Sequence, residues 1–361
     1  DKPAECYDYI SSLSDRTYNN TVFSKVYHPT YASDGKSQKA KNIILLIGDG
    51  NGLSQISSAV LANGGVLTLT QLRHIGLIKT ASADDLTTDS AAGGTAYAIG
   101  QKTNNRYIGV DSLGKPVPNL PERIERHGML SGVITTDEIT GATPSAFYAH
   151  RQDRGMTKEI AQDLSKSKLS FFAGGGRAHF DLHKLGKDFE IVRDLGSIGE
   201  SKEDKVGYFF AEREVSPVLA GRKDSLALLT REALKFFDKK EKPFFLMVES
   251  SYIDAYGHHN ETAGIVSEGI DFDRAITEAI KYADLHGNTL VIVTADHETG
   301  GFSIPHGDLS THRIEGDFTT HDHSATMVPV FSYGPGAGLF TGVYENSELF
   351  HKIMQSLDLE K

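Results

Sequence analysis

The sequence predicts an α/β fold: a large, mostly parallel central sheet with helices on both faces. Short apolar runs recur along the chain, and segments with helical spacing of apolar residues lie between them. A continuous apolar run is typical of a strand buried on both faces, and strands that alternate with helices build parallel βαβ units. The sequence has no internal repeat and no Pro/Ser-rich linker, so we expect one large domain.

Six runs are predicted to be strands of this sheet. The clearest is the run NIILLI at residues 42–47, which is apolar after its first position. Runs of this length that are bounded by polar or glycine residues favour strands over helices. The other five runs cover residues 75–78, 132–135, 244–248, 289–294 and 328–333.

Two segments between these runs have the spacing of amphipathic helices. Residues 225–239 place leucine, alanine and phenylalanine on one stripe, and lysines gather toward the end of the segment. The segment from about residue 263 to 286 repeats isoleucine and alanine at helical spacing, and Gly287 is placed to end it. Both helices are expected to pack on the sheet.

Charge and composition exclude several classes of protein. With 37 basic and 48 acidic side chains the net charge is −11, which argues against a nucleic-acid-binding surface. No apolar run approaches the roughly 20 residues of a membrane helix, so no membrane span is expected. The single cysteine, Cys6, excludes an internal disulfide and a cysteine-only metal cage. An anionic substrate would need positive charge supplied locally.

Acidic and histidine side chains follow three of the predicted strands. They are Asp49 after the first strand, Glu249, Asp254 and His258 around the end of the fourth, and Asp296 and His297 after the fifth. Ligands of open α/β sheets bind beyond the carboxyl ends of the strands, so these side chains should converge. Gathered there they would repel one another unless a cation held them, and they are donors suited to Zn²⁺ or Mg²⁺. The alternative is that each is a helix cap or a turn former.

A candidate nucleophile lies at the start of an Ala/Gly-rich segment. In the run TTDSAAGGTA, Ser90 is predicted to begin a helix whose free amides and dipole favour an anion. Bound to a zinc ion, a serine hydroxyl can lose its proton and act as a nucleophile without a histidine base. The alternative is that Asp89 or Ser90 is only an N-cap.

Taken together, these motifs resemble the alkaline phosphatases, metal-dependent phosphomonoesterases, of bacterial type. The resemblance covers about residues 41–336, and its motifs occur in the order seen in that family. The motifs are Gly48-Asp49-Gly50, Thr88-Asp89-Ser90-Ala91-Ala92, Ala142-Thr143-Pro144-Ser145, Glu249…Asp254…His258, Asp296-His297-Glu298 and His323.

The resemblance implies a role for each matching residue. Ser90 would be the serine that becomes phosphorylated, and Arg154 would clamp two phosphate oxygens with its planar fork. Three groups of residues would hold the metal ions, two Zn²⁺ and one Mg²⁺. They are the first zinc set (Asp254, His258 and His323), the second zinc set (Asp49, Asp296 and His297), and the magnesium set (Asp49, Thr143 and Glu249).

Some of these assignments have rivals, and the chain departs from the family at two positions. His321 is an alternative to His323, and Arg151 is an alternative to Arg154. Gly141 stands where relatives carry an aspartate or histidine beside the third metal, so we expect more water in that site. Ala255 stands where relatives often have a larger residue near the phosphate, which leaves room there.

The implied activity is hydrolysis of phosphate monoesters, with release of inorganic phosphate, through a phosphoserine on Ser90. A related metal-dependent phosphodiesterase and a catalytically silent phosphate-binding protein are the alternatives. The resemblance also implies a homodimer in the periplasm or outside the cell. We expect an N-terminal arm over residues 1–40 and a single phosphatase domain over 41–361, with a variable insertion at about 160–225.

Overall fold

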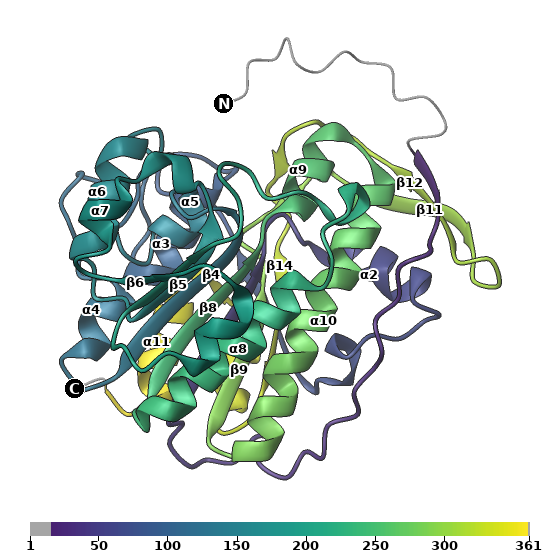
Figure 1. Cartoon of the computed structure of the whole chain (residues 1–361). Coiled ribbons are helices and arrows are strands. Elements are labelled where there is room, and N and C mark those ends of the chain that lie inside the picture. Colours follow the sequence, from purple (N-terminus) through teal and green to yellow (C-terminus); the bar gives the residue numbers. More distant parts are fainter. Residues whose placement is uncertain (1–15, 360–361) are drawn as a thin grey trace.

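A central β-sheet organises the computed structural model, which describes residues 16–359 (Figure 1). Within that range ten strands form the sheet, in the order β15-β3-β14-β9-β2-β8-β4-β5-β7-β6. β14 is antiparallel to its neighbours β3 and β9, and the other neighbouring pairs are parallel. The predicted α/β fold with a mostly parallel sheet is therefore confirmed.

All six predicted strands belong to this sheet, and two of them have the predicted bounds. The ten strands are β2 (Asn42–Gly48), β3 (His74–Lys79), β4 (Leu130–Glu138), β5 (Phe171–Gly175), β6 (Glu190–Val192), β7 (Val206–Phe209), β8 (Phe244–Ser250), β9 (Thr289–Thr294), β14 (Val328–Tyr333) and β15 (Gly342–Glu345).

Helices cover both faces of the sheet. Strand β2 illustrates why a strand in such a position is apolar after its first residue. Ile43, Leu45 and Ile47 point into one core, and the intervening Ile44 and Leu46 point into the other. Because successive strand residues face opposite sides, a strand covered on both faces needs apolar residues at every position. The first core includes α3 (Ser90–Ile99), α4 (Leu120–Glu125), α6 (Thr157–Lys166) and α11 (Asn346–Ser356), and the second includes α2 (Leu53–Ala62), α8 (Ser225–Lys240) and α10 (Thr262–His286).

The two predicted helices correspond to α8 and α10, which lie side by side on one face of the sheet (Figure 1). Lysines occupy the last turn of α8, where they complement the helix dipole. Gly287 ends α10 with φ 67°, a left-handed conformation that glycine adopts without steric cost. None of the helices within residues 16–359 has the length and apolar character needed to cross a bilayer.

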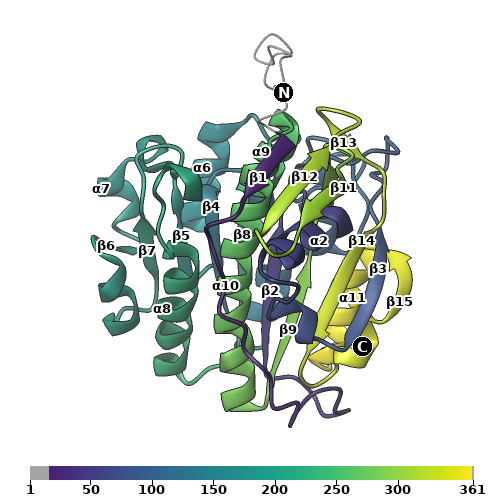
Figure 2. The ribbon, with the colours of Figure 1, turned by 90° about the vertical axis from the view of Figure 1, so that its right-hand side faces the viewer.

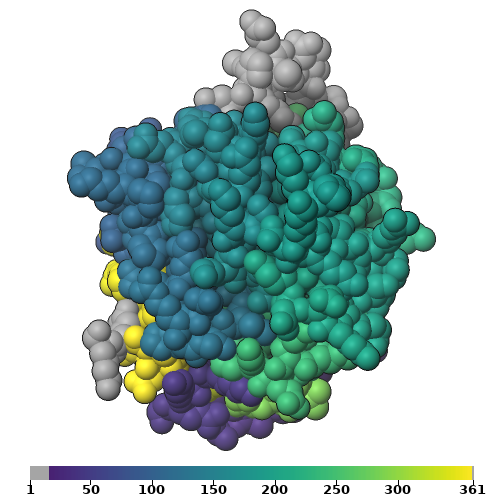
Figure 3. Space-filling view, turned by 60° about the vertical axis from the view of Figure 1, so that its left-hand side comes forward, coloured from purple at the N-terminus to yellow at the C-terminus, as the bar shows by residue number. Residues whose placement is uncertain are grey.

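Residues 160–225 extend the sheet at one edge. Their strands β5, β7 and β6 are parallel and continue outward from β4. The sequence analysis placed no strand in this segment. Figure 3 shows this side of the molecule, where the blue and teal part of the chain forms most of the visible surface. Short helices connect the strands: η3 (Arg177–His179), α7 (Leu182–Leu185), η4 (Leu195–Glu200) and η5 (Val218–Ala220).

Residues 16–40 of the predicted arm lie against the domain, and the arm's first fifteen residues are outside the described residues. Strand β1 (Thr17–Asn19) pairs with β12 (Arg313–Asp317), which pairs with β11 (Ser303–Asp308), as Figure 2 shows. Farther along, Tyr27 and Thr30 hydrogen-bond to Asp284 of α10. A second small ladder joins β10 (Glu298–Thr299) to β13 (His323–Ser324). Two short helices complete the elements needed for the site: α5 (Ala142–Ser145) and α9 (Tyr252–His259).

Candidate active site

The predicted ligands meet at the carboxyl ends of three adjacent strands. β2 lies between β8 and β9, and all three are parallel, so their carboxyl ends share one edge of the sheet. Asp49 follows β2, Glu249 is near the end of β8, and Asp296 follows β9. All three carboxylates are buried. The convergence expected from the sequence is therefore present.

The second zinc set surrounds the candidate nucleophile. His297 Nε2 lies 3.2 Å from Asp49 Oδ1 and 3.3 Å from Asp296 Oδ2. Ser90 Oγ lies 3.0 Å from His297 Nε2 and 3.2 Å from Asp49 Oδ2. Asp296 Oδ2 is buried without a hydrogen-bond partner among the described residues. A buried, unsatisfied carboxylate oxygen that faces an imidazole nitrogen marks a place where a cation fits.

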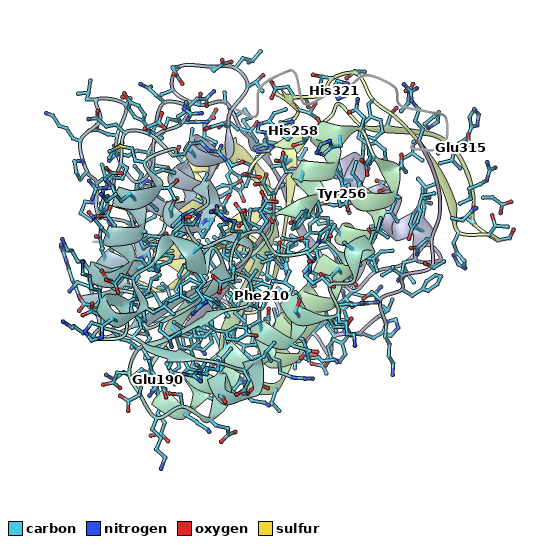
Figure 4. All side chains as sticks on the ribbon, turned by 45° about the horizontal axis from the view of Figure 1, so that its top comes forward. Glu190, Phe210, Tyr256, His258, Glu315 and His321 are labelled. Carbon is cyan, nitrogen blue, oxygen red and sulfur yellow. The ribbon has the colours of Figure 1, made fainter. Side chains whose placement is uncertain are left out.

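The first zinc set forms a second triangle of donor atoms. Asp254 Oδ1 lies 3.3 Å from His258 Nε2 and 3.2 Å from His323 Nε2, and the two Nε2 atoms are 3.1 Å apart. Asp254 and His258 are one turn apart on α9, as their spacing predicted. Figure 4 shows His258 and His321 close together at this end of the molecule.

Hydrogen bonds fix the orientation of all three imidazoles. His258 Nδ1 donates to the His321 carbonyl at 2.5 Å, and His323 Nδ1 donates to the Thr88 carbonyl at 2.8 Å. His297 Nδ1 contacts Thr299 Oγ1 at 3.2 Å, and the Thr299 hydroxyl itself donates to Asp254 at 2.5 Å. Since a carbonyl can only accept, Nδ1 carries the proton in His258 and His323, and because the Thr299 hydroxyl donates to Asp254, its oxygen accepts from His297 Nδ1. The Nε2 lone pairs therefore face the carboxylates. This arrangement is the usual outer shell of a metal-bound histidine.

The spacing of the donor atoms also fits a metal ion. Ligands 2.0–2.1 Å from a tetrahedral zinc ion are separated from each other by about 3.3 Å. The donor–donor distances in both zinc sets are 3.1–3.3 Å. Protons are a poorer solution, because protonated Nε2 atoms of His258 and His323 would repel each other at 3.1 Å. The residues present therefore fit two divalent cations.

Electrostatics at the strand ends lead to the same conclusion. Burial raises the pKa of Asp49 well above its usual value, and the nearby Asp296 and Asp254 raise it further. Burial likewise raises the pKa of Glu249, and Asp49 and Asp137 add to the shift. At Asp254 burial favours the neutral acid, but without bound cations the adjacent His258 and His323 outweigh it and hold the pKa of that carboxyl well below its usual range. Without bound cations, this site carries negative charge at high cost.

The N-cap of α3 is Asp89, so Ser90 is available for chemistry. Asp89 Oδ1 accepts a hydrogen bond from the Ala92 amide at 2.9 Å. Its other oxygen accepts from the Arg106 amide at 2.9 Å and from Arg154 Nη1 at 3.2 Å. One carboxylate thus caps the helix and holds the arginine beside it. Of the two sequence alternatives, the cap is Asp89, while Ser90 Oγ points toward the second zinc set.

The structure also separates the two pairs of rival residues. Arg151 forms a two-point ion pair with Asp163, at 2.9 and 2.5 Å, whereas Arg154 lowers the pKa of Asp49 by its charge. The geometry therefore favours Arg154 as the arginine at the site. His323 Nε2 faces Asp254, while His321 Nδ1 lies 2.9 Å from the His258 carbonyl. This favours His323 as the metal ligand, with the His321 carbonyl orienting His258.

The magnesium set is brought together less completely. Glu249 accepts a hydrogen bond from Thr135, and it lies in the electrostatic field of Asp49. Thr143 is the second residue of α5, and its hydroxyl is buried without a hydrogen-bond partner among the described residues. α5 contacts both β4 and β8, so Thr143 lies at the same end of the sheet as Glu249.

Two contributors at this end of the sheet were missed by the sequence analysis. Thr299 links the two zinc sets, and Asp137 adds a further carboxylate close enough to raise the pKa of Glu249. Neither carries a sequence signal, and both positions become informative only once the strand ends are assembled.

Comparison with known proteins agrees with this geometry. Residues 40–316 match the family model described as alkaline phosphatase. Alkaline phosphatase 4 of Bacillus subtilis is 30% identical, with 98% of this chain and 96% of that protein covered. Alkaline phosphatase of Escherichia coli is 30% identical, over 91% of this chain and 88% of that protein. The structure of alkaline phosphatase from the Antarctic bacterium TAB5 is 42% identical with a TM-score of 0.85, covering 90% of this chain and all of that one.

The chain belongs to the alkaline phosphatase family. It is accordingly an enzyme that hydrolyses phosphate monoesters, as the sequence resemblance predicted. Metal dependence is a property of this family, and among the described residues the donor groups Asp49–Asp296–His297 and Asp254–His297–His323 are both arranged to bind an ion. A histidine-to-glutamate mutant of the TAB5 alkaline phosphatase, 41% identical with a TM-score of 0.86 and covering 90% of this chain and all of that one, has Mg bound in its M3 site.

Proposed function

We propose that this enzyme hydrolyses phosphate monoesters in two displacements, through a phosphoserine on Ser90. The observation that carries the proposal is the position of Ser90 Oγ, 3.0–3.2 Å from His297 Nε2 and Asp49 Oδ2. The hydroxyl therefore adjoins the donor atoms of the second zinc set, at the start of α3, where helix amides and the helix dipole favour an anion.

In the first displacement Ser90 Oγ attacks phosphorus and the bond to the ester oxygen breaks. The alcohol leaves with that electron pair and takes up a proton, while the hydroxyl proton of Ser90 passes to solvent. In the second, a water oxygen attacks the phosphorus of phosphoserine and gives up a proton, the bond to Oγ breaks, Oγ takes up a proton to regenerate the hydroxyl, and inorganic phosphate departs. Arg154, held by Asp89, would pair with two phosphate oxygens through both displacements.

We assign zinc to the first and second zinc sets and magnesium to the set of Asp49, Thr143 and Glu249. Imidazole with carboxylate suits Zn²⁺, and an all-oxygen set suits Mg²⁺. When bound, these cations supply Lewis acidity, which stabilises the charge that develops on the entering and leaving oxygens. The homodimer and the periplasmic or secreted location, which the resemblance implies, stay predictions.

A phosphoenzyme trap tests the proposal directly. The wild-type protein, quenched in acid during turnover of a ³²P-labelled monoester, should retain label on the peptide that contains Ser90. Ser90→Ala should abolish the label and lower kcat for p-nitrophenyl phosphate about 10³-fold or more. Ser225→Ala is a matched control, because Ser225 also begins a helix, α8, but its hydroxyl donates to the Lys223 carbonyl. Label on another residue, or unchanged turnover by Ser90→Ala, contradicts the proposal.

The substrate class has its own test. Two cations and Arg154 suit a dianionic phosphoryl group, so p-nitrophenyl phosphate should be hydrolysed at least about 10²-fold faster than bis-(p-nitrophenyl) phosphate at equal concentration. A preference for the diester would favour the phosphodiesterase alternative. Tight phosphate binding without turnover of either compound would favour a catalytically silent protein.

A further inference from the structure

Asp137 occupies the space that a side chain at position 141 would need. A Cβ atom built on Gly141 would lie 2.2 Å from Asp137 Oδ2 and 2.9 Å from its Cγ. The backbone of Gly141 has φ −59° and ψ 165°, which any residue adopts. The absent side chain thus matters here for space and not for conformation, because a larger residue would require the Asp137 carboxylate, from the end of β4, to move.

Hydrogen bonds hold the Asp137 carboxylate in place and leave one of its oxygens without a partner among the described residues. Its Oδ1 accepts a hydrogen bond from the Glu138 amide at 2.7 Å, and its own amide donates to Thr135 Oγ1 at 2.8 Å. Its Oδ2 accepts no hydrogen bond from any residue within 16–359. The same Thr135 hydroxyl donates to Glu249, so one side chain connects the Asp137 backbone to the Glu249 carboxylate.

A second, independent observation also indicates a ligand in this place. The Thr143 hydroxyl is 99% buried, since the residue is 1% exposed, and within the described residues it has no partner. Thr143 lies two residues after Gly141, at the start of α5, which packs on β4 and β8. A buried hydroxyl without a partner costs free energy unless something outside the protein satisfies it.

The charges around this place are unbalanced. Asp49 and Asp137 both act on the Glu249 carboxyl, so two further carboxylates lie within electrostatic range of it. Arg154 acts on both Asp49 and Asp137 and offsets one of these charges. Oxygen donors with surplus negative charge and no imidazole among them select a hard divalent cation.

We propose that Asp137 Oδ2 is a donor to the third cation, taking the place that a side chain at position 141 would otherwise fill, and that Gly141 is needed to admit it. The inference rests on the proposed function, because it assigns a further residue to the magnesium set of Asp49, Thr143 and Glu249. The sequence predicts water in the space beside Gly141. The structure puts the Asp137 carboxylate there.

Equilibrium binding of Mn²⁺ to the zinc-loaded protein tests the proposal without any turnover. Free Mn²⁺ is followed by its electron paramagnetic resonance signal, with competition by Mg²⁺. Asp137→Asn, which keeps the shape and removes the charge, should weaken Mn²⁺ binding at the third site at least tenfold. Glu138→Gln is the matched control: it removes the adjacent charge, but that carboxylate pairs with His179 at 2.6 Å, so binding should change less than twofold.

A sharper test moves the carboxylate from position 137 to position 141. Gly141→Asp alone should weaken Mn²⁺ binding, because its Cβ collides with Asp137. Combined with Asp137→Ala, the same substitution should restore binding to within about threefold of wild type, since the carboxylate returns to the vacated space. If Asp137→Asn destabilises the fold, Gly141→Ala serves instead, and it should weaken binding in the wild-type background but not in the Asp137→Ala background.

Wild-type Mn²⁺ affinity in Asp137→Asn, or equal loss in Glu138→Gln, overturns the proposal. So does a failure of the exchanged pair to bind better than either single variant. These outcomes are separate from failure of the phosphoserine mechanism, because the titration can be repeated in the Ser90→Ala background, where no turnover is expected. Mn²⁺ binding there should match the wild-type value.

Discussion

Two buried clusters of acidic side chains in this molecule reach charge balance in different ways. On α10, Glu268 and Asp271 share the guanidinium of Arg222, which donates to Glu268 and lies 3.1 Å from Asp271 Oδ2. All three side chains of this arginine clasp are at least 97% buried. At the strand ends, four carboxylates are buried or half-buried with Arg154 as a nearby cation: Asp49, Glu249, Asp254 and Asp296.

The difference shows what distinguishes a structural cluster from a functional one. The clasp contains its own cation and ties the 217–222 segment to α10, since Glu268 also accepts from the Val218 amide at 2.7 Å. The strand ends have more negative charge than their arginine can offset, and their histidine Nε2 atoms are aimed at carboxylates. A cluster of this second kind is stable only with cations from outside the chain.

Removing metal should abolish activity at the strand ends without affecting the arginine clasp. A chelator that lowers zinc and magnesium below about a tenth of an ion per chain should reduce p-nitrophenyl phosphate turnover about 10³-fold or more, since Lewis acidity contributes several kcal/mol. Metal content and turnover are measured on the same sample, and adding back Zn²⁺ and Mg²⁺ should restore the rate. Turnover that persists in the metal-free protein would contradict the assignment of the strand ends as metal sites.

Removing Arg222 should have the opposite effect: it should lower stability and leave turnover almost unchanged. Arg222→Met leaves two buried carboxylates without a partner, which should lower the free energy of unfolding by about 3–5 kcal/mol. Denaturant unfolding followed by circular dichroism measures this loss. Adding Glu268→Gln and Asp271→Asn should recover most of it, while kcat per folded molecule stays within about twofold of wild type. A large change in metal content with Arg222→Met would mean that the two clusters are coupled.

Neutralising one carboxylate in each cluster should produce stability effects that differ in their dependence on metal. Burial and neighbouring carboxylates raise the pKa of Asp49, so its ionised form destabilises the metal-free fold. Asp49→Asn should therefore raise metal-free stability by about 1 kcal/mol at pH 8, yet lower the stability of the metal-loaded enzyme. Asp271→Asn, the matched control in the clasp, should change stability by the same amount with or without metal, because Asp271 pairs with Arg222 and belongs to none of the metal sets. An unchanged or lower metal-free stability for Asp49→Asn would contradict this.

Much of the fold could be predicted because β2, β8 and β9 are buried on both faces and so are apolar along most of their length. The strands β5, β7 and β6, which continue the sheet beyond β4, escaped prediction for the converse reason. β5 reads FFAGG and β6 is the three-residue stretch EIV, so neither gives a long apolar run. Their strand geometry comes from pairing with β4 and with each other, which is a tertiary effect.

The candidate site could be predicted where ligands follow strands along the chain. Asp49, Asp296 and His297 are of this kind. The choice between His321 and His323 needed ring orientations, because two histidines so close in sequence give the same pattern. Asp137 could not be found from sequence, since its place depends on the absent side chain of Gly141, four residues away in the loop before α5.

A histidine–carboxylate pair outside the site gives the smallest and most specific test of the comparison. His150 resembles His258, with Nδ1 2.5 Å from the Gly109 carbonyl and Nε2 3.0 Å from Glu122. The described residues place no further histidine beside it. A proton on His150 can therefore offset the charge of the Glu122 carboxylate, as a metal ion would offset the carboxylates at the strand ends. Burial lowers the pKa of His150, but the hydrogen bonds to Glu122 and Gly109 outweigh this and raise the pKa above its usual value.

The sign of the pH dependence follows from this shift. A raised folded-state pKa stabilises the protein fully below the unfolded value of about 6.5 and loses that contribution as pH rises through the folded value. His150→Gln should thus cost less than about 1 kcal/mol near pH 6, because both partners are partly exposed, and nothing measurable at pH 9. Unfolding curves of the variant and wild type at both pH values measure the difference, and Glu122→Gln should reproduce it. A loss of stability that persists at pH 9 would mean that His150, like His258, acts as an unprotonated imidazole. The orientation of the imidazole lone pair would then not distinguish the His150–Glu122 pair from the metal sets at the strand ends.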